Sequence, residues 1–133
     1  MAEIKMNEPV RILVVEDAKA AQIVAKLYLT ELNCLVDTAD NGMIALTQAN
    51  TVRYDAILMD LGLSNGPNGF ETTSLIKASS TLNKDTPVIA LTIHSEAQFN
   101  AQAAAVGMKG FLYKPFTLSE AKELVDSIRN SLQ

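Results

Sequence analysis

The sequence predicts an α/β fold in which helices cover both faces of a five-stranded parallel sheet. Five short apolar runs rich in β-formers alternate with five longer segments that carry helical start and stop signals. Two of the runs, Ile12–Val15 and Ile57–Met59, are continuously apolar, as expected of strands that are covered on both faces. The links between repeats are short, and right-handed crossovers would place the helices on both sides of the sheet.

The predicted strands follow the apolar runs in chain order. They are Arg11–Val15, Leu35–Ala39, Ala56–Met59, Val88–Thr92 and Gly110–Tyr113. Pro87 precedes the fourth strand, and Pro115 closes the fifth. Asp60 ends the third strand, which we expect at the centre of the sheet.

The predicted helices occupy the segments between the strands. They are Lys19–Leu32, Gly42–Ala49, Phe70–Ser79, Glu96–Val106 and Leu118–Leu132. Asp40 or Asn41, then Asn68 and Ser95, are the expected N-caps of the second, third and fourth helices. A capping box of Thr117 and Glu120 starts the last helix, whose charges are expected to form a solvated face. Gly107 stands after the Ala-rich fourth helix, where a left-handed residue is needed.

Length and composition indicate one soluble globular domain. The 133 residues divide into a flexible lead-in at 1–9 and a domain at 10–133. The net charge is −4 and there is no dense Lys/Arg block, which argues against direct binding to nucleic acid. Cys34 is the single cysteine, so the chain can form no intrachain disulfide, as is compatible with a reducing cytosol. No apolar run approaches the length of a membrane span.

Chemically active side chains follow four of the predicted strands. Glu16 and Asp17 end the first, Asp60 the third, Thr92 the fourth and Lys114 the fifth. Because ligands of parallel sheets bind beyond the carboxyl ends of the strands, these side chains are expected to converge at one edge. Three carboxylates at such close range repel each other unless a cation joins them.

This set of side chains suits phosphoryl transfer with a hard divalent cation. Oxygen ligands, few in number, favour Mg²⁺, and an aspartate can act as a nucleophile towards phosphorus. Asp60 is the expected nucleophile, Asp17 a direct metal ligand and Glu16 a ligand through water. Thr92 would hold a phosphoryl oxygen, and Lys114 would pair with the acid or the phosphoryl group.

Four short motifs resemble the receiver domains of response regulators in two-component signalling. They are Val14–Asp17, Leu58–Asp60, Ala90–Thr92 and Lys114–Phe116, and the resemblance extends from Arg11 to Ser131. The residues of the two stretches Ala90–Thr92 and Gly107–Met108 are most similar to those of receivers in hybrid sensor histidine kinases.

The resemblance implies a (βα)₅ flavodoxin-like fold and a Mg²⁺- or Mn²⁺-dependent transfer from a phosphohistidine to Asp60. It implies that the backbone carbonyl of Gly62 is a further metal ligand. It also implies that Thr92 moves towards the phosphoryl group and that Phe111 then turns inward. The domain would assist its own phosphorylation and slow dephosphorylation without being an enzyme for a separate substrate.

The resemblance also implies partners and a location. The phosphoryl donor would be a histidine kinase or a histidine phosphotransfer domain, and the parent protein could be a hybrid histidine kinase. Phosphorylation would change the conformation of the face made by the fourth helix, fifth strand and fifth helix, and partners would recognise this change. Formation of a homodimer through the same face is kept as an alternative. The implied location is the cytoplasm, including the cytoplasmic part of a membrane-bound sensor kinase, with no membrane contact by the domain itself.

Two stretches depart from the family pattern. Receivers commonly place a glycine eight residues after the nucleophile, whereas Gly69 follows Asp60 by nine, so the path of this loop and of the Gly62 carbonyl is open. The residue after the Thr is usually small, whereas Ile93 is bulky and stiff. Ile93, His94 and the absent side chain of Gly62 are expected to modulate dephosphorylation.

Three other functions stay open. A phosphatase of the haloacid-dehalogenase type would need a second Asp two residues after the first, where Gly62 stands. A flavodoxin-like cofactor binder would need a phosphate-cradling loop where Glu16 and Asp17 stand. A degenerate receiver that acts as a non-phosphorylated docking module is kept open by Ile93 and the unusual loop.

Overall fold

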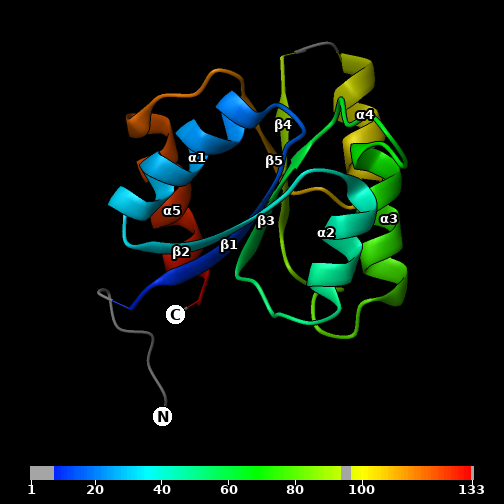
Figure 1. The fold of residues 1–133 in the computed structure, drawn as a ribbon, viewed down its shortest axis with the longest axis horizontal. Helices are drawn as coiled ribbons and strands as arrows, with labels where there is room; N and C mark the ends of the chain where they lie inside the picture. Colours follow the sequence, from blue (N-terminus) through cyan, green and yellow to red (C-terminus); the bar gives the residue numbers. More distant parts are fainter. Residues whose placement is uncertain (1–7, 94–96, 133) are drawn as a thin grey trace.

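Five parallel strands form one sheet in the order β2-β1-β3-β4-β5 (Figure 1). The computed structural model describes residues 8–93 and 97–132. The strands are β1 (Val10–Val15), β2 (Cys34–Ala39), β3 (Ala56–Asp60), β4 (Val88–Thr92) and β5 (Gly110–Tyr113). The predicted parallel sheet with β3 at its centre is confirmed, and each strand lies within one residue of its predicted bounds.

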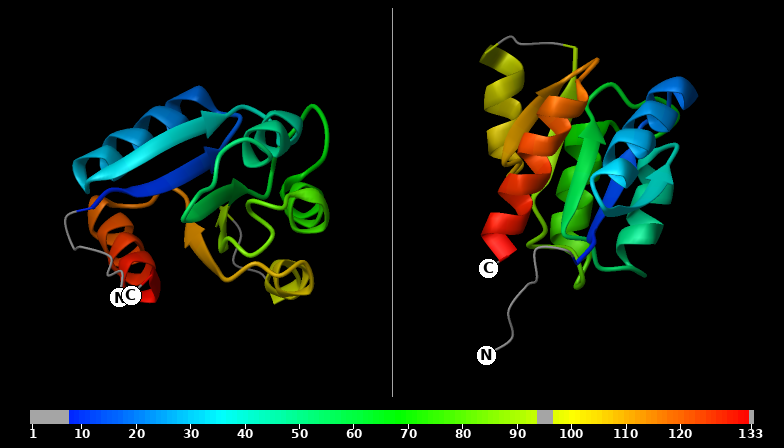
Figure 2. Two further views of the ribbon diagram at one scale, coloured as in Figure 1. Left: turned by 90° about the horizontal axis from the view of Figure 1, so that it is seen from below. Right: turned by 90° about the vertical axis from the view of Figure 1, so that its left-hand side faces the viewer.

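Helices cover both faces of the sheet (Figures 1 and 2). They are α1 (Lys19–Glu31), α2 (Gly42–Ala49), α3 (Gly69–Ser79), α4 (Ala97–Ala105) and α5 (Leu118–Leu132). Helices α1 and α5 pack on one face, where Ala25, Leu29 and Val125 join one apolar core. Helices α2, α3 and α4 pack on the other face and form the second core.

The central strand β3 contributes to both cores. Ile57 and Met59 point into the core beneath α2, α3 and α4, whereas Ala56 and Leu58 point into the core beneath α1 and α5. All residues of β3 are buried, including Asp60 at its end. This two-sided burial explains the continuous apolar run, because neither side of the strand faces solvent. It also fixes the position of Asp60.

Side-chain caps start the helices where the sequence suggests them. The Asn41 side chain accepts from the Ile44 amide at 2.9 Å, so Asn41 is the cap of α2. Asp40 instead accepts from Gln22 Nε2 at 2.6 Å. A capping box of Asn68 and Glu71 starts α3. The expected Ser95 cap and the predicted helical residue Glu96 lie outside the described residues.

The end of α4 and the start of α5 also match their predicted signals. Gly107 has a φ of +86° after α4, in the left-handed region that ends helices. The Thr117 amide donates to Glu120 Oε1 at 3.0 Å, and the Glu120 amide donates to Thr117 Oγ1 at 3.1 Å. These two bonds form the predicted capping box at the start of α5.

Arg129 departs from the expected solvated face of α5, because it is buried. Its guanidinium donates to the backbone carbonyls of Glu8, Leu32 and Asn33. The side chain thereby joins α5 to the residues that precede β1 and to the end of α1. Of the lead-in predicted at 1–9, only Glu8 and Pro9 fall within the described residues. Across the described ranges, no helix has the length and hydrophobicity that a membrane crossing requires.

Candidate functional site

The carboxyl ends of the strands meet at the upper edge of the sheet in Figure 1. The chain passes from β1 outward to β2 and then back across β1 to β3, so the strand order reverses between β1 and β3. In parallel α/β sheets, ligands bind at such a reversal. Glu16 and Asp17 follow β1 here, and Asp60 ends the neighbouring β3.

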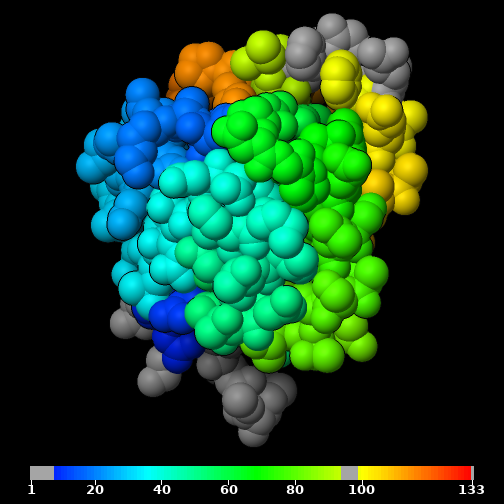
Figure 3. Space-filling model, turned by 45° about the vertical axis from the view of Figure 1, so that its right-hand side comes forward, coloured from blue at the N-terminus to red at the C-terminus, as the bar shows by residue number. Residues whose placement is uncertain are grey.

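A cleft of about 400 Å³ opens at this edge. Its lining includes most of the residues predicted for the site: Glu16, Asp17, Asp60, Gly62, Thr92, Ile93 and Lys114. On one side of the cleft, the segment that follows β3 lies against the start of α1, as the green and blue surfaces of Figure 3 show. The topology therefore brings together side chains that are up to 98 residues apart in the chain.

Three carboxylates converge at the floor of the cleft. One oxygen from each of Glu16, Asp17 and Asp60 lies within 4.8 Å of the others. Glu16 and Asp60 are only 1% and 3% exposed, whereas Asp17 is exposed. The Ala18 amide donates to Glu16 Oε2 at 3.1 Å and fixes this carboxylate at the start of α1.

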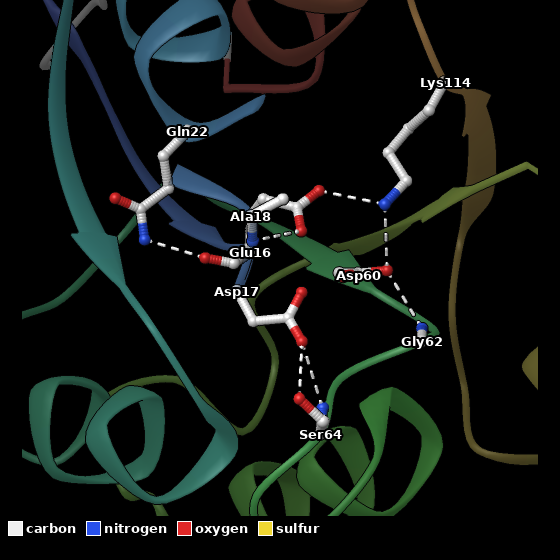
Figure 4. Close-up of polar contacts among 8 residues, drawn as sticks. All are labelled: Glu16, Asp17, Ala18, Gln22, Asp60, Gly62, Ser64 and Lys114. Atoms are coloured by element: carbon white, nitrogen blue, oxygen red, sulfur yellow. Dashed lines mark hydrogen bonds and ion pairs between the residues drawn. The ribbon is translucent and has the colours of Figure 1, made fainter. Parts of the chain in front are cut away.

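Lys114 joins the two buried carboxylates (Figure 4). Its Nζ lies 2.9 Å from Glu16 Oε1 and 3.2 Å from Asp60 Oδ1. Burial opposes the charged amine, but Glu16 and Asp60 outweigh it and raise the pKa of Lys114 above its ordinary value. The Lys114 amide donates to the Thr92 carbonyl at 2.8 Å, so β4 holds the lysine at the edge of the cleft.

The electrostatics of the cluster favour an added cation. Burial, followed by the neighbouring Asp60, raises the pKa of Glu16 to about 7, although Lys114 and the Ala18 amide act against this rise. Burial and a neighbouring acid both disfavour the charged carboxylate, so an added cation beside Glu16 and Asp60 would stabilise it. The three acids offer oxygen atoms as metal ligands, and the cleft around them is open. A Mg²⁺ ion needs such a site, because it binds oxygen and keeps several water ligands. The residues therefore fit a hard divalent cation.

The loop between β3 and α3 accommodates the extra residue that the sequence indicates. A Cβ atom on Gly69 would lie 2.3 Å from the Asp60 carbonyl oxygen, so α3 begins directly against the backbone of Asp60. Asn65 and Gly66 have φ values of 59° and 136° and turn the chain between these points. The Gly62 amide donates to Asp60 Oδ1 at 2.9 Å.

Ser64 and Gln22 are polar contacts of the site that sequence reasoning missed. Ser64 donates to Asp17 Oδ2 twice, from Oγ at 2.8 Å and from its amide at 3.2 Å. Partial desolvation acts to raise the pKa of Asp17, but the bonds from Ser64, together with Glu16 and Asp60, outweigh it and leave that pKa below its ordinary value. Gln22 Nε2 donates to the Glu16 carbonyl at 2.7 Å. The Ser64 contact spans 47 residues and depends on the tertiary fold, as does the bond from Gln22 to Asp40 across 18 residues.

The remaining predicted residues surround the cleft at different depths. Thr92 is 2% exposed at the end of β4, and Ile93, which follows it, is 72% exposed. Phe111 is partly buried against the core beneath α4, and its ring stacks on Tyr113 at a centroid distance of 6.2 Å. His94 lies outside the described residues.

Comparisons with known proteins agree with this geometry. The family model of the response regulator receiver domain matches residues 12–128. Histidine kinase 5 of Arabidopsis thaliana is 30% identical over 91% of this chain. The chemotaxis protein CheY-3 of Vibrio cholerae is 29% identical over 92% of this chain and 94% of its own length. These similarities confirm the resemblance that the four motifs indicate.

A solved structure that shares the fold holds a metal ion in its active site cleft. The receiver domain of the sensor histidine kinase PA1611 from Pseudomonas aeruginosa PAO1 is 31% identical, with a TM-score of 0.83. The match covers 92% of this chain and 98% of that one, and that structure holds a magnesium ion coordinated in its active site cleft. Other relatives are much longer: this chain spans 16% of histidine kinase 5 and 44% of ResD, a transcriptional regulatory protein of Bacillus subtilis.

Proposed function

Since the chain belongs to the response regulator receiver family, we propose that it is a signalling domain that accepts a phosphoryl group on Asp60. One observation supports this proposal above the others. The Asp60 carboxylate ends the buried central strand and faces a cleft that also contains Lys114, Thr92 and two further acids. A nucleophile in a fixed position beside groups that offset negative charge is what phosphoryl transfer requires.

The proposed donor is the phosphohistidine of a histidine kinase or of a phosphotransfer domain. An Asp60 carboxylate oxygen forms a bond to phosphorus while the bond from phosphorus to the histidine nitrogen breaks. The imidazole leaves with the electron pair of that bond, and Asp60 becomes an acyl phosphate. The Lys114 ammonium, already 3.2 Å from Asp60, offsets charge on the transferred oxygens.

Asp17, Asp60 and the Gly62 carbonyl would hold Mg²⁺ or Mn²⁺, with Glu16 acting through water. The ion would supply positive charge to the phosphoryl oxygens in the transition state. The three convergent carboxylates support this assignment, as does the magnesium ion in the similar PA1611 receiver.

Lys114→Gln is expected to strengthen Mg²⁺ binding and to slow phosphoryl uptake. The ammonium competes with a divalent ion for Glu16 and Asp60, so its loss should tighten Mg²⁺ binding by roughly tenfold. Isothermal calorimetry measures the affinity, and intact mass against time measures the uptake. Lys122→Gln, which removes an exposed lysine on α5, should change neither. Unchanged Mg²⁺ affinity in Lys114→Gln would contradict the competition.

Thr92 and Phe111 are the proposed switch residues. Thr92 at the end of β4 would move to the phosphoryl group, and Phe111 would then turn inward from its stack on Tyr113. Tyr113 is exposed on β5, so the change would reach the face of α4, β5 and α5. A partner, or a second copy of the chain, would bind there.

Ile93 is proposed to prolong the phosphorylated state. The side chain is 72% exposed, lines the cleft and follows Thr92 directly, so it stands where an attacking water would enter. Gly62 offers no side chain that could orient this water, and His94 is the further proposed modulator. Slow entry of water would lengthen the lifetime of the acyl phosphate.

Ile93→Ala is expected to lose its phosphoryl group several-fold faster than the unmodified chain. The smaller side chain opens the rim of the cleft to water without disturbing a buried contact. The decay of the phosphorylated mass after removal of the donor gives the rate. Ile23→Ala, an equal truncation of an exposed residue on α1, serves as the control. Equal decay rates in all three proteins would refute the role of Ile93.

The proposed setting is the cytoplasm, where histidine kinases meet their receivers, with no direct contact to nucleic acid or membrane. The domain takes part in its own phosphorylation and dephosphorylation and turns over no other substrate. The second candidate is a docking module that is never phosphorylated. The exposed Ile93 at the rim favours it, because a bulky side chain could also exclude the donor.

One experiment separates these two functions. The chain is incubated with Mg²⁺ and acetyl phosphate, and in parallel with Mg²⁺ and a phosphorylated histidine phosphotransfer protein. We expect the mass of one phosphoryl group to be added, to disappear with hydroxylamine and to fail to appear with EDTA. Uptake from the phosphotransfer protein alone would show that the cleft excludes small donors. No uptake from either donor would overturn the proposal in favour of the docking module.

A further inference from the structure

Ser64 connects the loop after β3 to the carboxylate that follows β1. Both its hydroxyl and its amide donate to the same atom, Asp17 Oδ2, at 2.8 and 3.2 Å (Figure 4). In Figure 4, the other oxygen of Asp17 points away from Ser64, to the side of Glu16 and Asp60. Two donors on one oxygen therefore leave the second oxygen directed into the cleft.

Asp17 needs such support because its position provides little constraint. Glu16 and Asp60 are buried and hydrogen-bonded, whereas Asp17 is exposed between the end of β1 and the start of α1. An exposed side chain that must adopt one rotamer to bind a ligand loses conformational entropy on binding. Hydrogen bonds that select this rotamer beforehand reduce that loss.

The same loop is held at a second point. The Gly62 amide donates to Asp60 Oδ1 at 2.9 Å, and two residues later Ser64 binds Asp17. The left-handed residues Asn65 and Gly66 follow, so the chain turns away immediately after the Ser64 contact. The loop that carries Gly62 is thus fixed between two of the three carboxylates.

We propose that Ser64 is a positioning residue for the divalent cation: its hydroxyl orients Asp17 and fixes the loop that carries Gly62. The inference rests on the proposed function, in which Asp17 is a direct ligand of Mg²⁺. The coupling is reciprocal, so the ion in turn orders residues 61–66. The longer loop after Asp60 thereby contributes to metal affinity through a side chain that does not touch the metal.

The test compares Mg²⁺ binding in Ser64→Ala and Ser64→Thr. Mg²⁺ alone is titrated, and the amide NMR shifts of Asp17 and Gly62 report occupancy. Ser64→Ala should bind Mg²⁺ about fivefold more weakly, the typical net worth of one intramolecular hydrogen bond. Ser64→Thr keeps the hydroxyl and should restore the affinity. Ser79→Ala, which removes a hydroxyl bound to the Leu75 carbonyl on α3, should match the unmodified chain.

Two further readouts separate positioning from a role in folding. In EDTA, thermal unfolding of Ser64→Ala should coincide with that of Ser79→Ala. In phosphorylation by acetyl phosphate, Ser64→Ala should need more Mg²⁺ for half-maximal rate yet reach the same rate at saturation. Unchanged Mg²⁺ affinity in Ser64→Ala, or a weaker affinity that Ser64→Thr does not restore, would overturn the inference.

The proposed function can fail separately from this inference. If the unmodified chain binds Mg²⁺ but takes up no phosphoryl group, the phosphoacceptor role fails while the titrations still decide the role of Ser64. If the chain is phosphorylated and Ser64→Ala binds Mg²⁺ normally, the role of Ser64 alone fails.

Discussion

Asp60→Asn is expected to abolish phosphoryl uptake from every donor. The amide oxygen is a weak nucleophile and cannot form the acyl phosphate, so the loss should be complete and not partial. The fold should persist, because the asparagine oxygen can still accept from the Gly62 amide that bonds to Asp60 Oδ1. Intact mass after incubation with Mg²⁺ and either donor measures uptake, and circular dichroism measures the fold.

Asp126→Asn is the matched control for this substitution. It makes the same atomic change and alters the net charge equally, but on the exposed surface of α5 beside Lys122. Asp126→Asn should take up one phosphoryl group as the unmodified chain does. Continued uptake by Asp60→Asn would refute Asp60 as the acceptor and direct attention to Asp17, the exposed acid of the cluster.

Gly69→Ala is expected to lower the free energy of unfolding and also to disturb the functional site. The new Cβ would lie 2.3 Å from the Asp60 carbonyl oxygen and 2.9 Å from the Leu61 Cα. Both neighbours are backbone atoms, so α3 or the end of β3 must shift. We expect the free energy of unfolding to fall by about 1–3 kcal/mol. The higher helix propensity of alanine should not compensate, because the contact is far shorter than a van der Waals distance.

Gly110→Ala provides the comparison for Gly69→Ala. A Cβ at Gly110 in β5 would find Ile89 Cδ1 as its nearest neighbour, at 3.9 Å, an ordinary contact. Urea denaturation should show Gly110→Ala close to the unmodified chain and Gly69→Ala clearly below it. Phosphoryl uptake should slow in Gly69→Ala, because Asp60 is displaced. Equal stability of the two variants would mean that α3 moves without strain.

The strands and most helices could be predicted because their signals are local. Continuous apolar runs marked β1 and β3, and Asn68, Gly107 and the pair Thr117 and Glu120 marked helix ends through contacts within a few residues. The convergence of the acids, Thr92 and Lys114 followed from topology, since parallel strands present their carboxyl ends at one edge. Local signals and one topological rule therefore sufficed for the floor of the site.

Two of the contacts that escaped prediction join segments distant in the chain. Ser64 and Asp17 are 47 residues apart, and their bond depends on the path of a loop with an extra residue. Arg129 seemed part of a solvated helix face because its local pattern is polar, yet it reaches carbonyls 96 and 121 residues away. Such hydrogen bonds form only where the fold brings two segments together, and local sequence patterns do not encode that distance.

The cleft combines a buried floor with an exposed rim, and this arrangement has an evolutionary consequence. Glu16, Asp60 and Thr92 are nearly inaccessible, whereas Ser64 and Ile93 are exposed. Substitutions at exposed positions usually change stability by less than about 0.5 kcal/mol. With Ser64 and Ile93 acting as proposed, descendants of this chain could acquire faster or slower signals by drifting at the rim, while selection for the proposed phosphoryl chemistry keeps the floor constant. Under the proposed function, the duration of a signal can change in such descendants before the chemistry of the site does.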